Sequence, residues 1–283
     1  MVCSGTFLMV NTLPNLRILP LNDLILHEDH DRQRTLPLVA KLRAQGILRN
    51  PPIVMPLDDG TGRFMVLDGA NRVTSLQEME FPHVVAQVAP YDDPHVCLGT
   101  WNHVVWGMSH RTLLADLRKA KEVELRKINT RKSHTPPVGM PAQIRLLDGS
   151  VYLATTAPDL SSAVAGLHRI VNSYKDRASL DRTSQTLTEG LDDVHPDLTA
   201  LVIFPRFEVT TVLTLAGRGD LLPTGITRFT VSPRALHLNY PLHELSSGKP
   251  IQYKEAYLQH WVQERIKNKG VRHYAEATFL FDE

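Results

Sequence analysis

The chain has 283 residues, of which 42% are hydrophobic, and its formal net charge is +1. This balance lacks the basic excess of a dedicated nucleic-acid-binding protein, and two cysteines, Cys3 and Cys97, exclude a disulfide framework and a four-thiolate metal site. Few cysteines favour a reducing, cytoplasmic location. The N-terminus lacks the pattern of a signal peptide, and no apolar run approaches the length of a membrane helix, so we expect no membrane segment.

The first 90 residues alternate between short strands and helices. The apolar pattern predicts a strand over residues 17–26, a helix over 36–43 that Gly46 ends, a hairpin of 53–55 with 63–67, a helix after 69 and a strand over 83–88. After Gly99 we expect a helix to begin at Val104 and to continue through Val123. Its polar side is rich in lysine and arginine, which we interpret as a solvated face rather than a nucleic-acid groove.

Residues 135–141 are rich in proline and are the best linker candidate, so we expect domains at 1–132 and 138–283. Beyond them the pattern predicts a hairpin of 144–147 with 151–154, a helix from 160 capped by Asp159 or Ser161, strands at 201–204, 226–231, 235–238 and 273–281, and a helix over 253–266. Residues 207–216 fit either a strand or a helix. The predicted class is mixed α+β with two lobes.

One stretch carries the clearest chemical signal. The β-prone run Phe64–Leu67 stops at Asp68–Gly69, and a helical pattern begins at once. Amides of the first turn, at Ala70, Asn71 and Arg72, together with the helix dipole favour a bound phosphate. Arg72 can add a two-pronged hydrogen bond, and Asp68 can face a Mg²⁺ ion that phosphates bring. Alternatively, Asp68 only caps the helix and Arg72 only pairs with a carboxylate.

Further motifs follow in a fixed order along the chain. They are Leu26–Glu28 with Arg34, then Val66–Arg72, Thr100–His103 and Pro223–Phe229. In this order they resemble the free L-serine kinases, a branch of the ParB/sulfiredoxin fold. The resemblance implies a ParB/sulfiredoxin-like N-terminal lobe, a mixed α+β C-terminal lobe and an active site in the cleft between them.

The resemblance also implies a reaction and its residues. A phosphoryl group would pass from ATP or ADP, with Mg²⁺, to the hydroxyl of free L-serine, giving O-phospho-L-serine. Glu28 would be the catalytic base and Asp68 the residue that faces the metal. The nucleotide phosphates would be held by Gly69, Ala70, Asn71, Arg72 and Arg34. The serine site would be formed by Trp101, His103, Thr227 and Arg228, with Arg228 and Thr227 on the carboxylate of serine.

One position departs from the family, which usually has histidine where this chain has Asn71. Asparagine donates a hydrogen bond but carries no proton near neutral pH. Simpler interpretations of the other residues stay open: a solvated Glu28, a core Trp101 and a strand-face Arg228. We interpret His27 and His30 as residues that bind no metal, because their spacing differs from the zinc-protease motif.

Two other functions remain alternatives. A ParB-like, nucleotide-dependent DNA-binding regulator would fit the fold, but the chain has no helix-turn-helix pattern after the first lobe, and DNA is an unexpected partner. A sulfiredoxin-like reductase would need a cysteine in the loop after the strand, and residues 68–72 contain none. The sequence therefore predicts a kinase acting on small molecules.

Overall fold

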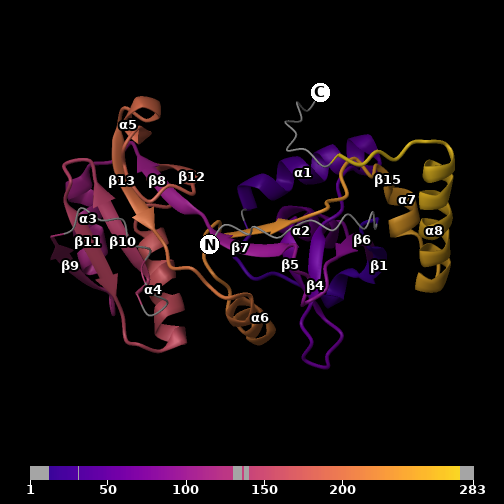
Figure 1. The fold of residues 1–283 in the computed structure, drawn as a ribbon, viewed down its shortest axis with the longest axis horizontal. Helices are drawn as coiled ribbons and strands as arrows, with labels where there is room; N and C mark the ends of the chain where they lie inside the picture. The colour runs from indigo at the N-terminus through magenta and orange to yellow at the C-terminus, as the bar shows by residue number, and fades with distance from the viewer. Residues whose placement is uncertain (1–12, 31, 130–135, 137–139, 275–283) are drawn as a thin grey trace.

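The computed structural model describes residues 13–30, 32–129, 136 and 140–274, and for residues 32–34 it describes the backbone alone. Within these residues, the strands form two larger sheets and two short pairs. The larger sheets lie apart in Figure 1, one at the left end of the molecule and the other in its right half, where α7 and α8 lie beyond it. Helices and strands are interspersed along the chain, which confirms the mixed α+β class.

The first body is built on a sheet with the strand order β1-β6-β4-β5-β2. Its elements are β1 (Leu16–Pro20), β2 (Leu24–Ile25), β4 (Ile53–Pro56), β5 (Phe64–Asp68), β6 (His83–Val88), α1 (Arg32–Gln45) and α2 (Ala70–Glu78). β4 and β5 pair antiparallel, which confirms the predicted hairpin. Gly46 follows α1 with a φ of 66°, the left-handed conformation expected for a glycine that ends a helix.

The C-terminal elements pack on this first body. β15 (Tyr240–Pro241) pairs with β3 (Ile47–Leu48), and α7 (Leu242–Ser246) and α8 (Ile251–Lys267) follow. Tyr240, Leu245 and Leu258 are buried in the same core as Val54 and Val66. The chain therefore returns to its first body at its end, as the yellow helices of Figure 1 show.

The second body is built on an antiparallel sheet with the strand order β12-β8-β13-β10-β11-β9. Its elements are β8 (Asn102–Trp106), β9 (Glu124–Ile128), β10 (Ala142–Leu146), β11 (Val151–Thr155), β12 (Ser179–Thr183), β13 (Leu198–Ile203), α3 (His110–Lys119), α4 (Leu160–Asn172) and α5 (Leu191–Val194). The side chain of Asp159 accepts a hydrogen bond from the amide of Ser162, which confirms the predicted cap of α4.

The two bodies are joined by a short antiparallel pair, β7 (Val96–Thr100) with β14 (Thr227–Val231), and by α6 (Val209–Arg218). β7 lies between the two sheets in Figure 1. One apolar core runs through this junction, because it includes Met65 of the first sheet, Val202 of the second and Leu213 of α6. The pairing of β7 with β14 brings the Thr100–His103 motif beside the Pro223–Phe229 motif.

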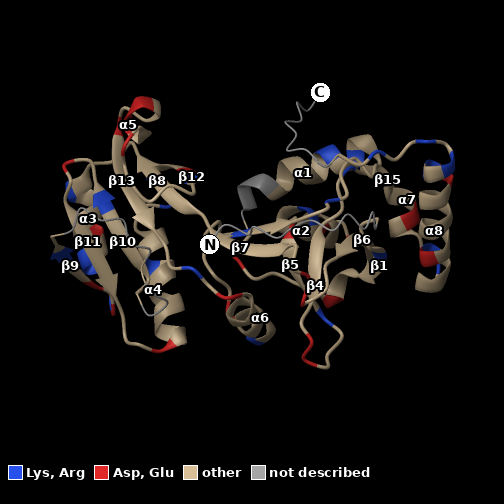
Figure 2. Cartoon of the chain, viewed as in Figure 1, with Lys and Arg blue, Asp and Glu red and all other residues tan. Residues whose placement is uncertain are grey.

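The expectation that a helix begins at Val104 is wrong. Val104 and Val105 are buried in strand β8, which pairs with β12 on one side and β13 on the other. β-branched residues suit such a position, and the helix begins only at His110, after the Ser109 cap. It ends at Lys119, and Arg126 and Lys127, two of the basic residues beyond it, belong to β9. Figure 2 shows these basic groups on α3 and β9 and acidic groups on α5, so both signs occur on the second body.

Other expectations near the C-terminus have mixed outcomes. Most of residues 207–216 belong to the helix α6, which settles the choice between strand and helix. Residues 235–238 form no strand; β15 is the nearest one. The strand expected over 273–281 lies mostly outside the described residues.

The expected boundary between residues 132 and 138 differs from the division of the sheets. β8, α3 and β9 precede it, yet they belong to the second body, while β15, α7 and α8 follow it and belong to the first. The physical reason is strand pairing: β8 is an inner strand of the second sheet and needs neighbours that the later chain supplies. Among the described residues, no helix is long and apolar enough to cross a membrane.

Candidate active site

Asp68 and Gly69 form the sharp turn between β5 and α2. Gly69 has φ 98° and precedes the first helical residue, Ala70. A Cβ atom there would lie 3.0 Å from the guanidinium carbon of Arg72 and 3.0 Å from the Cα atom of Pro52. Glycine is therefore required both for the left-handed conformation and for space. The N-cap residue of α2 is Gly69, and the carboxylate of Asp68 accepts hydrogen bonds from arginine side chains.

Arg72 contacts the backbone of the preceding loop as well as Asp68. Its Nη1 donates to the carbonyl oxygens of Asn50 at 2.9 Å and Pro51 at 3.1 Å, and its Nη2 donates to Oδ2 of Asp68 at 3.1 Å. The ion pair anticipated in the simpler interpretation is thus present. Ala70 and Asn71, which form the N-terminus of α2, are half-buried and lie beside the cationic side chain of Arg72.

Arg234, which the sequence motifs did not single out, also donates to Oδ2 of Asp68. Burial alone would raise the pKa of Asp68, but the two neighbouring guanidinium groups lower it below its usual range. Asp68 is therefore ionised at neutral pH. Arg72, Asp68 and Arg234, called the arginine cradle below, together carry one net positive charge.

Magnesium fits this place only in company with an anion. Among the described residues, no three His, Cys, Asp or Glu side chains gather as a metal site. Asp68 offers a single carboxylate, and Mg²⁺ in such sites usually binds one or two carboxylates together with water and substrate phosphates. The residues present therefore fit a phosphate-bound magnesium ion and do not form a metal site of their own.

Glu28 is held by the loop that begins the Pro223–Phe229 motif. Its Oε2 accepts from the amide of Gly225 at 2.6 Å, and its Oε1 accepts from the amides of Ile226 at 3.0 Å and Thr227 at 2.6 Å. The hydroxyl of Thr227 also lies 2.6 Å from Oε1. These contacts fix the orientation of the carboxylate, and Oε2 has fewer donors than Oε1. Glu28 is therefore anchored rather than freely solvated.

His27 links this loop to the strand that leads into the arginine cradle. Its Nδ1 lies 2.7 Å from the carbonyl oxygen of Val66 in β5, and its Nε2 lies 2.7 Å from the Thr227 hydroxyl. Burial lowers the pKa of His27, although Glu28 and the Val66 carbonyl oppose this shift. The neutral ring donates from Nδ1 to the carbonyl oxygen of Val66 and accepts at Nε2. The Thr227 hydroxyl has a single proton, which it can donate either to Nε2 of His27 or to Oε1 of Glu28.

His103 supports the same loop from the second body. Its Nε2 lies 3.1 Å from the carbonyl oxygen of Gly225, and its Nδ1 lies 2.8 Å from the hydroxyl of Tyr174. Burial lowers the pKa of His103 to about 4, so the ring is neutral, donates to Gly225 and accepts from Tyr174. Both side chains are buried. The structure places His103 behind the loop, not at its surface.

Trp101 and Arg228 lie together at the β7–β14 junction. The guanidinium carbon of Arg228 lies 4.3 Å from the centre of the Trp101 ring, a cation–π contact. The amide of Trp101 donates to the carbonyl oxygen of Ile226 at 3.0 Å, next to the contacts of Glu28. Both side chains are half-buried, whereas Thr227 is buried against Glu28 and His27.

Two further arginines concern the site: one that the sequence predicted, Arg34, and one that it did not, Arg182. Arg34 lies in the first turn of α1, and its side chain is outside the described part of the structure. Arg182 of β12, which sequence reasoning missed, packs against Gly225: a Cβ atom on that glycine would overlap its guanidinium group. No local motif signals Arg182 or Arg234, because both reach the site from distant strands or loops.

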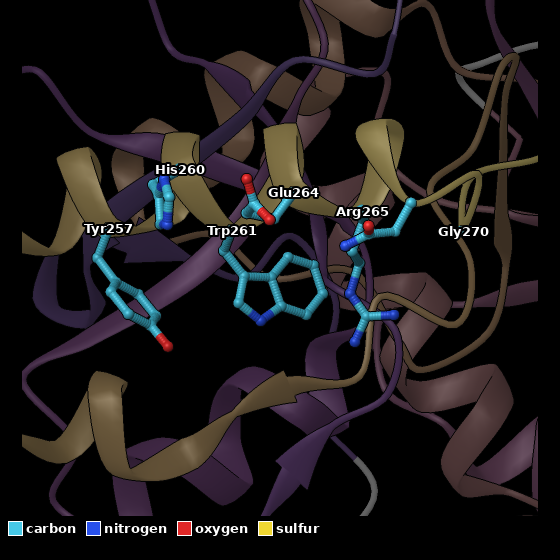
Figure 3. A pocket seen from close by; sticks show the side chains of 7 residues that line it. Tyr257, His260, Trp261, Glu264, Arg265 and Gly270 are labelled. Carbon is cyan, nitrogen blue, oxygen red and sulfur yellow. The ribbon is translucent and has the colours of Figure 1, made fainter.

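Two open pockets of the described structure lie away from these residues. Figure 3 shows one of about 500 Å³ along α8, lined by Tyr257, Trp261 and Arg265 among others. A second, of about 600 Å³, lies between the β4–β5 connection and α6 and is lined by Asp58, Asp59 and Arg218 among others. None of the residues expected for catalysis lines either pocket.

The chain is similar to known proteins over most of its length, although no protein-family model matches it. It is 26% identical over 275 residues to the ATP-dependent L-serine kinase SbnI of Staphylococcus aureus, covering 95% of this chain and 98% of that protein. It is 29% identical over 102 residues to an ATP-dependent L-serine kinase of Staphylothermus marinus, covering 36% of this chain and 40% of that protein.

Solved structures show the same fold. SbnI from Staphylococcus aureus with a C-terminal truncation superposes with a TM-score of 0.73 at 21% identity, over 89% of this chain and 97% of that one. A free serine kinase in complex with AMP gives a TM-score of 0.69 at 14% identity, over 85% and 98% of the two chains. These comparisons confirm the resemblance on which the expectations rest: this chain is similar in sequence to L-serine kinases and has the fold of the free serine kinases.

Proposed function

We propose that the protein is a free L-serine kinase that transfers a phosphoryl group from ATP to the hydroxyl of L-serine, giving O-phospho-L-serine. The observation that carries this proposal is the match to an ATP-dependent L-serine kinase along 98% of that protein's length. A second relative carries the same activity in its name. ADP is the alternative donor. The kinase relatives favour this reading over a DNA-binding regulator.

The two halves of the site fit the needs of phosphoryl transfer, which depends mainly on positioning and on neutralising charge. The amides at the start of α2, with Arg72, would bind the nucleotide phosphates, and Asn71 would donate a further hydrogen bond. Mg²⁺ would be held by Asp68 and the phosphates, and it would supply positive charge at the transferred group. Arg34 would reach the same phosphates from α1.

Glu28 would accept the proton of the serine hydroxyl. The loop amides hold its carboxylate in one orientation, and Oε2, which accepts from Gly225 alone, is the oxygen that would take the proton. The serine oxygen keeps the electron pair of its broken O–H bond and forms the new bond to phosphorus, and the leaving nucleotide takes the electron pair of the bond that breaks.

The serine itself would lie against the β7–β14 junction. Arg228 would bind its carboxylate, and Trp101, which stacks on Arg228, would form the wall of the site. His103 and Thr227 would act from behind, because both are buried and hydrogen-bonded to the Glu28 loop or to Glu28 itself. We further propose that the first body is the ParB/sulfiredoxin-like lobe, that the substrates meet in a cleft where the bodies join, and that the protein is cytoplasmic.

The direct test is product formation. Purified protein would be incubated with Mg²⁺, L-serine and either ATP or ADP, and O-phosphoserine would be measured by mass spectrometry. We expect serine-dependent product with ATP. Threonine and homoserine in place of serine would define the acceptor. Failure to form O-phosphoserine with either nucleotide would overturn the proposal.

A further inference from the structure

We propose that Arg234 belongs to the nucleotide site, where it exchanges its contact with Asp68 for the phosphates of the nucleotide. This inference rests on the proposed function and adds to it a residue outside every motif. Arg234 lies three positions after the end of β14, and its guanidinium and that of Arg72 share one oxygen of Asp68. Asp68 carries one negative charge and the two guanidinium groups carry two positive charges, so one positive charge is left over.

The exposure of the arginine cradle allows a ligand to reach it. The side chains of Arg234 and Asp68 are 39% and 40% exposed, and that of Arg72 is 20% exposed. An anion with several oxygens could therefore bind both guanidinium groups at once. The helix N-terminus of α2 begins two residues after Asp68, so its amides are available to the same anion. This combination fits a phosphate chain better than a single carboxylate.

Arg234 is held in place by the first body and is not a chance surface contact. The side chain of Gln87 in β6 donates to the carbonyl oxygen of Pro233 at 2.8 Å and accepts from the amide of Ala235 at 2.9 Å. Gln87 is buried. These two bonds clamp the backbone on both sides of Arg234, so the loop that carries the side chain needs little further ordering when a ligand binds.

The same loop positions both arginines. Asn50 accepts from Arg72 through its carbonyl oxygen at 2.9 Å and from the amide of His237 through Oδ1 at 2.8 Å. The segment that carries Arg234 and the side chain of Arg72 are therefore fixed to one residue. A purely structural Arg234 would only tie its segment to the first body, which the bonds of Gln87 and Asn50 already do.

The test measures the binding of ADP, AMP and adenosine by calorimetry, without metal and in the presence of EDTA. We expect Arg234→Gln to weaken ADP binding about tenfold and AMP binding less, and to leave adenosine binding unchanged, because one charge-assisted hydrogen bond to phosphate is lost. Arg234→Lys should lie between the two. Arg63→Gln is the matched control, since Arg63 also pairs with an aspartate and its side chain is 34% exposed.

A second variant gives an effect of opposite sign. Asp68→Asn removes the anion that competes for Arg234, so metal-free ADP binding should become several-fold tighter. The gain should shrink in the Asp68→Asn, Arg234→Gln double variant. Unchanged unfolding temperatures and adenosine affinities would show that these variants fold and keep the rest of the site.

The outcomes separate this inference from the proposed function. Equal loss of adenosine and ADP binding in Arg234→Gln, or no change in ADP binding, would overturn the role of Arg234 while O-phosphoserine formation still supports the kinase. Selective loss of ADP binding in a protein that forms no O-phosphoserine would support Arg234 and overturn the kinase. Absence of metal-free ADP binding by the wild type would overturn the role of Arg234, while O-phosphoserine formation would still decide the kinase.

Discussion

Glu28 and Asp68 are the two carboxylates of the candidate site, and different donors surround them. Glu28 accepts from three backbone amides of the loop 225–227, whose positions are set by the fold. Asp68 accepts from the side chains of Arg72 and Arg234, which can rotate toward another anion. Backbone donors hold a carboxylate in one orientation, whereas guanidinium donors can be exchanged. We infer that Glu28 is a fixed group and that Asp68 lies in an exchange site.

The largest expected effect tests the fixed group. In Glu28→Gln, the side-chain amide cannot act as a base. Its NH2 group also faces a backbone N–H that donated to the carboxylate oxygen of Glu28. We expect the rate of O-phosphoserine formation to fall by about 10²–10⁴ with nucleotide affinity retained. The control is Asp29→Asn, because the side chain of Asp29 is 43% exposed and pairs with His168. Near wild-type turnover in Glu28→Gln would remove Glu28 from the chemistry.

The second effect concerns the support behind that group. The pKa of His103 is about 4 in the folded protein, below its usual 6.5. Between these pH values the unfolded chain binds a proton that the folded chain does not, so folding stability is lost as the pH falls from 6.5 toward 4. The loss can reach about 3 kcal/mol.

The measurement is the free energy of unfolding in urea at several pH values. His103→Gln should lower stability at neutral pH and reduce its dependence on pH across this window. His260→Gln should leave the dependence unchanged, because the side chain of His260 is exposed. An identical pH dependence in His103→Gln and the wild type would contradict the buried neutral state.

How well the sequence predicted these two regions depends on the distance between their residues. The turn at Asp68, Gly69 and Arg72 is local, so its strand, glycine and helix could be read from a few residues. Arg234 lies 166 positions from Asp68, and no local pattern connects them. The loop amides lie 197 to 199 positions from Glu28. Only the resemblance to a family suggested that these two motifs act together.

The main error in the fold has the same origin. Val104 and Val105 could not be assigned from local sequence, because their strand is defined by partners at residues 179–183 and 198–203. The helix α6 was ambiguous for a related reason: its β-branched residues favour a strand, whereas the spacing of Val209, Val212, Leu213 and Ala216 favours a helix. The burial of Val212, Leu213 and Ala216 in the junction decides between the two. In α6, tertiary packing thus overrides the local β propensity where the two bodies meet.

The third prediction sharpens the boundary between the two regions. Arg228→Ala should raise the KM for serine about tenfold and leave the affinity for nucleotide unchanged, because a charge-assisted hydrogen bond to the carboxylate is lost. The matched control is Arg265→Ala, which removes another arginine that stacks on a tryptophan, at 3.9 Å from Trp261. Serinamide should be a poor substrate of the wild type. Joint loss of serine and nucleotide affinity would assign Arg228 to packing.

The smallest effect tests whether the exchange site needs its sharp turn. In Gly69→Ala the new methyl group would lie 3.0 Å from the Arg72 guanidinium and from the backbone of Pro52, at a φ of 98°. The backbone strain should cost about 1–2 kcal/mol of stability. Arg72 can rotate away from the methyl group, but the Pro52 backbone cannot, so the loop that supports both arginines must shift. We therefore expect ADP binding to weaken a few-fold as well, while adenosine binding is retained.

Gly149→Ala is the control, because Gly149 also has a positive φ, of 81°, but nothing lies within 4 Å of its added methyl group. The control should show the same strain in the unfolding temperature without a change in ADP affinity. If both variants lose only stability, the turn at Gly69 serves folding alone, and the phosphates are held elsewhere.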